Sequence, residues 1–156
     1  MKLSSGLTEI PASMFYGCEN LMKVVIPEGV KGIGDNAFTQ CFSLIDITLP
    51  NGLEKIGEEA FFGCEMLQKV VLPESVKELG NAAFYECSSL ESITIPEGVK
   101  SIEGFAFGRC TSLESIAIPE GVTSIGYRAF QDCKNLDVVI ENSKEIMTLL
   151  NRDEIK

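Results

Sequence analysis

The amino-acid sequence predicts an α/β solenoid, in which similar coils of 23 residues stack along one axis. The first observation is that six cysteines are spaced 23 residues apart: Cys18, Cys41, Cys64, Cys87, Cys110 and Cys133. The second is that six phenylalanines, six leucines and five of the six prolines follow the same period. Because four residue types share one register, we expect residues 1–156 to form one domain, with a half coil over 7–20 and repeats over about 21–141.

Each coil is predicted to begin with a strand. In residues 90–96, L-E-S-I-T-I-P, the apolar Ile93 and Ile95 alternate with polar residues. Pro96 then ends the strand, because proline cannot donate a hydrogen bond to a ladder. Stacking places equivalent strands about 4.8 Å apart. The pattern therefore predicts one parallel β-sheet along the solenoid.

The second half of each coil is predicted to turn back toward the core. Turn residues follow the proline at positions 97–98, and Val99 and Ile102 then point inward. The segment A-F-x-x-C, residues 106–110 in this coil, places its apolar side chains at helical spacing. This spacing predicts one short helical or 3₁₀ turn in every coil.

The full pattern, L-x-x-I-x-I-P-x-x-V-x-x-I-G-x-x-A-F-x-x-C, resembles the BspA-like, treponemal-type leucine-rich repeat. Two coils that carry it are LIDITLPNGLEKIGEEAFFGC and LESIAIPEGVTSIGYRAFQDC, and the resemblance covers roughly residues 7–141. It implies a right-handed leucine-rich-repeat solenoid with the sheet on the concave face and the helical turns on the convex side. It also implies a surface or secreted protein of bacteria or protists that binds proteins or takes part in adhesion. No catalytic residues are implied.

Three segments depart from the pattern. Glu103 stands where other coils have glycine, and Gly104 follows it, so we expect the turn there to be shifted by one residue. After residue 141 the period ends, and the apolar side chains of residues 143–151 lie on one helical face, which predicts a capping helix with a frayed tail as the alternative. At the other end the half coil 7–20 has no visible cap. We therefore expect the N-terminal end to associate weakly with another chain or to continue into further repeats.

The cysteines are predicted to be buried, reduced thiols. Each occupies the same place in its coil, next to the Ala-Phe pair, where a free cysteine packs as a small hydrophobic residue. A disulfide would require parallel side chains to turn toward each other. A structural zinc site needs ligands that converge as a tetrahedron and not a straight row, so neither arrangement is expected.

Composition excludes several kinds of function. The net charge of -10 argues against nucleic acid as a partner, because nucleic-acid-binding proteins need basic patches. The sequence contains no histidine, which excludes Ser-His and Cys-His nucleophilic pairs and histidine metal sites. No apolar run approaches the roughly 20 residues of a membrane span, and residues 1–6 show no apolar signal-peptide core. We expect no enzyme, no metal and no cofactor.

The concave face carries the candidate binding site. Its outward positions are apolar in the first coils and become acidic and hydroxylic in the last, where Glu91 and Glu114 lie. The predicted ligand-binding patch consists of Met22, Val25, Phe42, Ile45 and Val71. An exposed apolar cluster with a polar rim is typical of a protein interface. The alternative is that the valines are only good strand formers and that Phe42 folds onto the rim.

These observations predict a non-catalytic module for protein–protein interaction, in adhesion or ligand binding at a bacterial cell surface. A structural spacer within a longer repeat protein is the alternative, and a glycan-binding module is a weaker one. The aromatic column Tyr16, Phe62 and Tyr85 is expected to be partly buried between coils.

Overall fold

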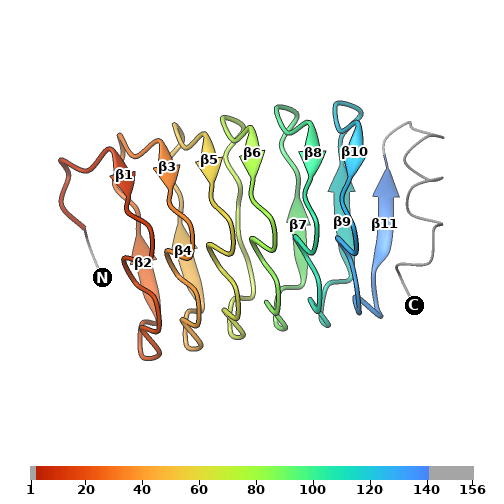
Figure 1. The fold of residues 1–156 in the computed structure, drawn as a ribbon, viewed down its shortest axis with the longest axis horizontal. Coiled ribbons are helices and arrows are strands. Elements are labelled where there is room, and N and C mark those ends of the chain that lie inside the picture. Colours follow the sequence, from red (N-terminus) through yellow and green to blue (C-terminus); the bar gives the residue numbers. More distant parts are fainter. Residues whose placement is uncertain (1–2, 141–156) are drawn as a thin grey trace.

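The structure is a computed structural model that describes the backbone of residues 3–140 and the side chains of residues 3–136. The chain winds into a solenoid that runs from the N-terminal to the C-terminal end without reversing (Figure 1). We number five full coils, each starting at a column leucine: coil 1 (21–43), coil 2 (44–66), coil 3 (67–89), coil 4 (90–112) and coil 5 (113–135). The half coil 7–20 precedes coil 1.

One face of the solenoid, here called the long-strand face, carries the strand predicted at the start of each coil. Its strands are β2 (Lys23–Val25), β4 (Asp46–Thr48), β7 (Ser92–Thr94), β9 (Ser115–Ile118) and β11 (Asp137–Ile140). All pair in parallel, and β2 pairs with β4 at a spacing of one repeat, with Val24 opposite Ile47. β11 pairs with β9 at a spacing one residue shorter than the repeat, with Asp137 opposite Ser115. The reason is that β11 begins directly after the column residue Leu136, whereas β2 begins one residue later after Leu21.

A second row of strands, here called the short-strand face, was not predicted. Its six strands have two residues each: β1 (Glu9–Ile10), β3 (Gly32–Ile33), β5 (Lys55–Ile56), β6 (Glu78–Leu79), β8 (Ser101–Ile102) and β10 (Ser124–Ile125). All but β1 follow the turn after the proline of their coil, and all pair in parallel. The inward-pointing column of Ile33 and Ile56 belongs to these strands.

The predicted helical or 3₁₀ turns are wrong. Within residues 3–140 the structure has no helix, and the A-F-x-x-C segments are turns, so the described chain is all-β and not α/β. In coil 1 Asn36 and Gln40 adopt left-handed backbone angles, with φ of 57° and 59°, and equivalent residues of the other coils do the same. Two left-handed residues four apart prevent a continuous helix.

The backbone hydrogen bonds of these turns explain why the left-handed residues are needed. In the half coil, Met14 N–H and Tyr16 N–H donate to residues three earlier, Pro11 and Ser13. The intervening Phe15 N–H donates across to Ala37 O of the next coil at 2.8 Å. A helix directs all its amides back along itself. In these turns the amides alternate: every second one donates within its own turn, and those between them donate to the next coil.

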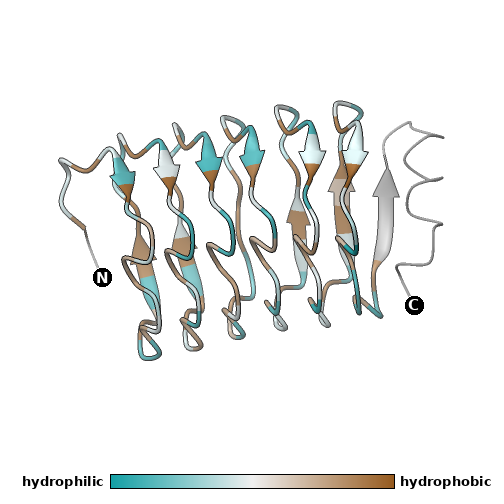
Figure 2. Ribbon diagram, viewed as in Figure 1, coloured by the Kyte–Doolittle hydropathy of each residue, from teal (hydrophilic) through white to brown (hydrophobic). Residues whose placement is uncertain are grey.

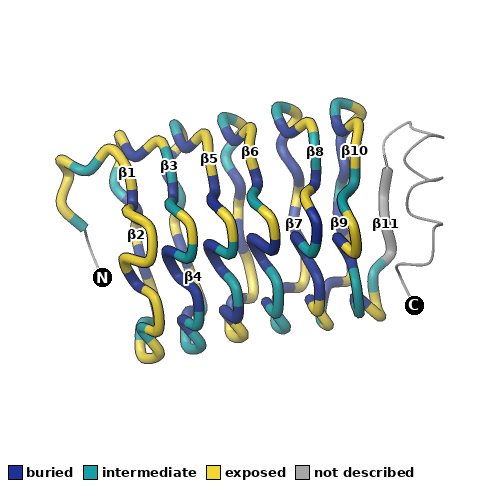
Figure 3. The backbone as a smooth tube through the Cα atoms, viewed as in Figure 1, coloured by how far each residue is buried: buried dark blue, intermediate teal, exposed yellow. Residues whose placement is uncertain are grey.

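The core consists of straight columns of identical side chains. Phe38, Phe61 and Phe84 are fully buried and stack with ring centroids 5.2–5.3 Å apart. The buried positions recur at the same height in successive coils (Figure 3) and coincide with the apolar stripes of Figure 2. Stacked aromatic rings add to the free energy gained by burial alone. The predicted core columns are therefore confirmed for the coils described.

The cysteine column joins neighbouring coils through thiol hydrogen bonds. Cys64 Sγ donates to Phe38 O of the preceding coil at 3.2 Å, and Cys87 Sγ donates to Phe61 O at the same distance. All six cysteines are free thiols, as the sequence predicts, and five of them are buried. The predicted burial is wrong for Cys18, which is only half-buried. Burial, with the neighbouring Cys18, raises the pKa of Cys41 from 9.0 to about 11, and burial also raises the pKa of Cys64 well above 9.0.

The predicted capping helix over residues 143–151 lies outside the described residues.

Candidate functional site

The long-strand face presents its alternate side chains outward. In β2, Lys23 and Val25 are exposed and Val24 is buried. Three members of the predicted patch are exposed: Met22 at 55%, Val25 at 48% and Val71 at 69%. The other two, Phe42 and Ile45, are only half-buried.

Phe42 contributes less to this face than predicted, because its ring lies near the backbone of Gly63, where an added Cβ would be 3.9 Å away. The exposed patch therefore consists of Met22, Val25 and Val71, and Ile45 lies at its edge.

Polar side chains surround this patch and replace it in the last coils. Lys23 Nζ and Asp46 Oδ2 lie 3.9 Å apart, and both side chains are exposed. Exposed pairs of this kind contribute little to stability. In coils 4 and 5, Glu91 and Glu114 are exposed at the starts of the strands. The face is apolar at one end and acidic at the other, as the sequence predicts.

The ladder of the long-strand face loosens at coil 3. Residues 69–71 form no strand, and Lys69 joins Asp46 and Ser92 only through isolated bridges. At regular places the ladder continues past the strand: Ile26 N–H donates to Thr48 O at 2.9 Å. Among residues 3–140 neither of the equivalent bonds of coil 3 is formed: Leu49 N–H does not donate to Val71 O, and Leu72 N–H does not donate to Thr94 O. The ladder is therefore loose on both sides of coil 3. A cavity of about 200 Å³ lies at this place, lined by Lys69, Val70, Val71, Leu72, Glu74, Ser92, Ile93 and Thr94.

The short-strand face is broken on one side of coil 3, at the junction with coil 4. β1, β3, β5 and β6 form one sheet, and β8 and β10 form another, so β6 and β8 are not hydrogen-bonded. Elsewhere Gly57 N–H donates to Ile33 O and Gly80 N–H donates to Ile56 O, both at 2.8 Å. In the described chain Glu103 N–H makes no such bond with Leu79 O. A groove of about 580 Å³ opens over this region.

The side chain of Glu103 accounts for the break. A Cβ added to Gly57 would lie 2.7 Å from Asp35 N and 2.8 Å from Gly34 C, closer than real Cβ atoms come. Gly80 and Gly126 are equally close to the coil before them. Glu103 occupies this glycine column, so its Cβ holds coil 4 away from coil 3. Its carboxylate accepts a hydrogen bond from the Ser101 hydroxyl, which keeps the side chain on the surface.

The predicted one-residue shift of the following turn is wrong. Ala82 N–H donates to Gly104 O at 2.9 Å, in the same register as Glu59 N–H to Asn81 O. Phe84 N–H likewise donates to Ala106 O at 2.8 Å. The turn therefore stays in register, and the strain of the extra Cβ is relieved by separating the strands instead.

Comparison with known proteins identifies the repeat. The model of the BspA type leucine-rich repeat region matches residues 1–147 in six copies. The chain belongs to this family. A search of curated proteins found no match. Leucine-rich repeat proteins typically serve as protein-interaction modules and are typically not catalytic.

Solved structures of bacterial leucine-rich repeat proteins share the fold. The leucine-rich repeat protein of T. pallidum, TpLRR, is 34% identical with a TM-score of 0.69, over 97% of this chain and 83% of that chain. A leucine-rich cell surface protein from Faecalibacterium prausnitzii is 34% identical with a TM-score of 0.61, over 87% of this chain and 45% of that one. The pneumococcal vaccine antigen PcpA is 26% identical with a TM-score of 0.72, over 96% of this chain and 38% of its own. The chain thus spans less than half the length of the last two.

This BspA-type repeat also carries a row of aromatic rings along the turns. Phe62 and Tyr85 stack at 5.2 Å, Tyr85 meets Phe105 edge-on at 6.0 Å, and Phe105 meets Tyr127 at 5.6 Å. Phe62, Tyr85 and Phe105 are half-buried, as predicted for the first two. The prediction is wrong for Tyr16 of the same column, which is exposed at 52%. Sequence reasoning missed Phe105 and Tyr127 because they belong to other columns. The signal was Gly108: a Cβ there would lie 2.7 Å from the Tyr85 ring, so the glycine makes room for that ring.

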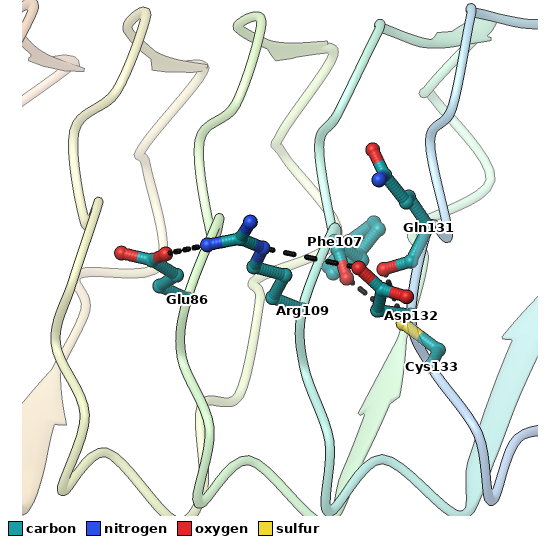
Figure 4. A network of polar contacts seen from close by, with 6 residues as sticks. All are labelled: Glu86, Phe107, Arg109, Gln131, Asp132 and Cys133. Atoms are coloured by element: carbon teal, nitrogen blue, oxygen red, sulfur yellow. Dashed lines mark hydrogen bonds and ion pairs between the residues drawn. The ribbon is translucent and has the colours of Figure 1, made fainter.

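An arginine ties three coils of the repeat together beside this row. Arg109 Nη1 donates to Glu86 Oε1 at 2.7 Å, and its Nε lies 3.8 Å from Asp132 Oδ2 (Figure 4). The guanidinium also lies 5.7 Å from the centroid of the Tyr85 ring. The hydrogen bond to Glu86 raises the pKa of Arg109. These contacts span coils 3, 4 and 5, so they support the junction that Glu103 loosens.

Two kinds of site find no support in residues 3–140. No group of three or more Cys, Asp or Glu side chains there is placed to hold a metal ion. None of the secondary structure in that range is a helix long and apolar enough to cross a membrane.

Proposed function

We propose that this chain is a non-catalytic module that binds a protein partner through its long-strand face, in adhesion or ligand binding at a bacterial cell surface. One observation carries the proposal: three large apolar side chains, Met22, Val25 and Val71, are exposed on one face whose remaining outward residues are mostly polar. A cluster of this kind, rimmed by polar groups, is typical of an interface.

The energy available from this patch suits a modest interface. Fully burying one Val or Met side chain contributes about 1.5–3 kcal/mol. The three side chains would thus act as the few residues that dominate binding, with the polar rim excluding water around them. The net charge of -10 makes a nucleic-acid partner unfavourable and a basic protein surface favourable.

The surface location is proposed from the relatives. The F. prausnitzii protein is named a cell surface protein, and PcpA is named a vaccine antigen. This chain matches less than half of the length of each protein. The activities of the whole proteins are therefore carried over only as a proposal.

A matched pair of variants tests the proposal. Met22 and Met66 are exposed to similar extents, 55% and 46%, but Met66 lies in the loop before the strands. The patch variant combines Met22→Gln with Val25→Thr and Val71→Thr, which keep β-branched residues in the sheet. The control is Met66→Gln. Each protein is immobilised and exposed to bacterial and host-cell lysates, and captured proteins are identified and then purified for calorimetry.

The proposal predicts that a purified partner binds wild type and Met66→Gln equally and binds the patch variant at least tenfold more weakly. Equal binding by all three would contradict it. That result would favour the alternative, a structural spacer, which the intercoil contacts of Arg109 support because they stiffen three successive coils. A glycan partner would instead depend on the aromatic row, and Tyr127→Ala would then reduce binding.

A further inference from the structure

The loosened junction between coils 3 and 4 creates a small cavity on the long-strand face, next to the exposed Val71. We propose that this cavity is the anchor point of the interface and takes one aliphatic side chain from an extended, basic segment of the partner. The inference rests on the proposed function, since it assumes that the long-strand face binds protein.

The lining of the cavity suits an aliphatic side chain. Val70, Leu72 and Ile93 are buried and provide apolar atoms at its base, while Ser92 and Thr94 are exposed beside it. Its volume of about 200 Å³ is enough for a Leu, Ile or Met side chain. Anchor residues that fill pockets supply most of the energy of protein interfaces.

Two backbone groups at the cavity lack the partners that their counterparts have. Ile26 N–H and Ile95 N–H each donate to the next coil, at 2.9 and 3.0 Å. In residues 3–140 neither Leu72 N–H nor Thr94 O makes the equivalent bond. A partner whose anchor side chain enters the cavity brings its own amide and carbonyl to this place, as an added strand does at a sheet edge.

The charges around the cavity specify a basic segment. Glu91 directly precedes β7 and lies three residues before Thr94, roughly 10 Å away by the rise of a β-strand, and Glu114 follows it in the next coil. On the strands of coils 4 and 5 the remaining outward residues, Ser92, Thr94, Ser115 and Ala117, carry no charge. Two charged residues line the cavity itself, Glu74 and Lys69, and Lys69 is bridged to Ser92. Carboxylates still outnumber cations around the cavity, so a lysine three residues from an aliphatic anchor is attracted toward Glu91.

The cavity lies where the ladder is irregular, between coils 3 and 4. Thr48 stands in the same column as Thr94, but β4 pairs regularly with β2 over three residues. This difference supplies a matched control: Thr94→Phe places a ring at the mouth of the cavity, whereas Thr48→Phe places the same ring on the same face at a paired strand.

The experiment uses short synthetic peptides and the whole chain. Acetyl-Leu-Gly-Gly-Lys-amide is titrated into isotope-labelled protein and followed by amide chemical shifts. Acetyl-Ala-Gly-Gly-Lys-amide tests the anchor, and acetyl-Leu-Gly-Gly-Glu-amide tests the charge. The proposal predicts shifts centred on Val71, Leu72 and Thr94, and at least fivefold weaker binding by either control peptide. Thr94→Phe is expected to abolish the shifts, and Thr48→Phe to retain them.

Shifts centred elsewhere, or equal binding of the leucine and alanine peptides, would overturn the inference. Loss of binding in Thr48→Phe as severe as in Thr94→Phe would do the same. The two proposals fail separately. If the peptide binds at the cavity but the patch variant still captures its protein partner at full affinity, the proposed function fails and the cavity stands. If the patch variant loses its partner but the peptides do not bind, only the anchor is wrong.

Discussion

Coils 1 and 3 begin with almost the same sequence, L-M-K-V-V-I-P at residues 21–27 and L-Q-K-V-V-L-P at 67–73, yet only the first forms a regular strand. β2 pairs with β4 over three residues, whereas the equivalent residues of coil 3 join their neighbours through Lys69 alone. Val71 is accordingly more exposed than Val25, at 69% against 48%. Strand propensity cannot explain this difference, because the strand residues are the same.

The difference lies in the next coil. Coil 2 has Gly57 where coil 4 has Glu103, so coils 1 and 2 pack closely and coils 3 and 4 do not. Coils 3 and 4 are still joined by the backbone hydrogen bonds of their turns and by the Phe84 ring, which stacks on Phe107 at 5.6 Å. On the long-strand face the ladder is loose on both sides of coil 3, although coils 2 and 3 pack closely at Gly80. We infer that one Cβ on the short-strand face displaces the strand of coil 3 on the opposite face, so that it loses regular pairing with both neighbours. In a solenoid, where each coil contacts only its neighbours, such an effect reaches no farther.

The largest expected effect on stability comes from removing a ring of the aromatic stack that still joins coils 3 and 4. Phe84→Ala should cost about 3–5 kcal/mol in the free energy of unfolding, as for other buried aromatic residues. Phe62→Ala should cost clearly less, because its ring is only half-buried. Urea denaturation of both variants measures the difference. Equal losses would mean that the stacked core column does not hold coil 3 to coil 4.

A second variant should turn the regular junction into a loose one. Gly57→Ala adds a Cβ that would lie 2.7 Å from Asp35 N, so β5 must move away from β3. We expect a loss of about 1–3 kcal/mol, typical of overpacking. Hydrogen exchange should become faster at Ile26, Glu54 and Gly57, whose amides donate across this junction. Gly52→Ala is the control, since only the flexible end of Lys31 is near it.

A smaller loss of stability is expected at alkaline pH. It should concern the regular and the loose junction alike, because the cysteine column runs through both. The pKa of Cys41 is about 11 when folded against 9.0 ordinarily, so below pH 9 the thiol is protonated in both states and stability is unaffected. Above pH 9 the unfolded chain ionises first, and the free energy of unfolding should fall as pH rises toward 11. Urea midpoints from pH 7 to 10.5 measure this, with Cys41→Ala showing a shallower decline. A midpoint that rises with pH would contradict the buried, protonated column.

The smallest effect concerns the N-terminal end. β1 and β2 each have a hydrogen-bonded neighbour on one side only, and unpaired strand edges favour pairing with another chain. We expect weak association of this 156-residue chain, visible in light scattering over a concentration series. In the monomer we expect the amides of residues 7–30 to exchange rapidly. A strictly monomeric protein as protected there as over residues 80–110 would show that this end needs no cover.

The repeat period was enough to predict the coils, the long-strand face and the core, because identical residues at identical positions must stack. It did not predict the turns, since nothing in residues such as Asn36 or Glu59 announces a left-handed backbone angle. It also did not predict the loose strand of coil 3, whose residues Lys69–Val71 are the same as Lys23–Val25 of β2. Glu103 was visible as a departure, but its effect depends on how closely the glycine backbone approaches the preceding coil, which only the structure shows.

Hydrogen exchange in Glu103 variants tests most directly whether one Cβ opens the junction. Glu103→Gly removes the Cβ, whereas Glu103→Ala keeps it and removes only the carboxylate. We predict that in Glu103→Gly the amides of residue 103, Lys100 and Leu72 become protected to the level of Gly80, Lys77 and Ile26. We also predict that in Glu103→Ala they exchange as in wild type. Protection gained equally in both variants would show that the charge opens the junction, and protection gained in neither would contradict the account.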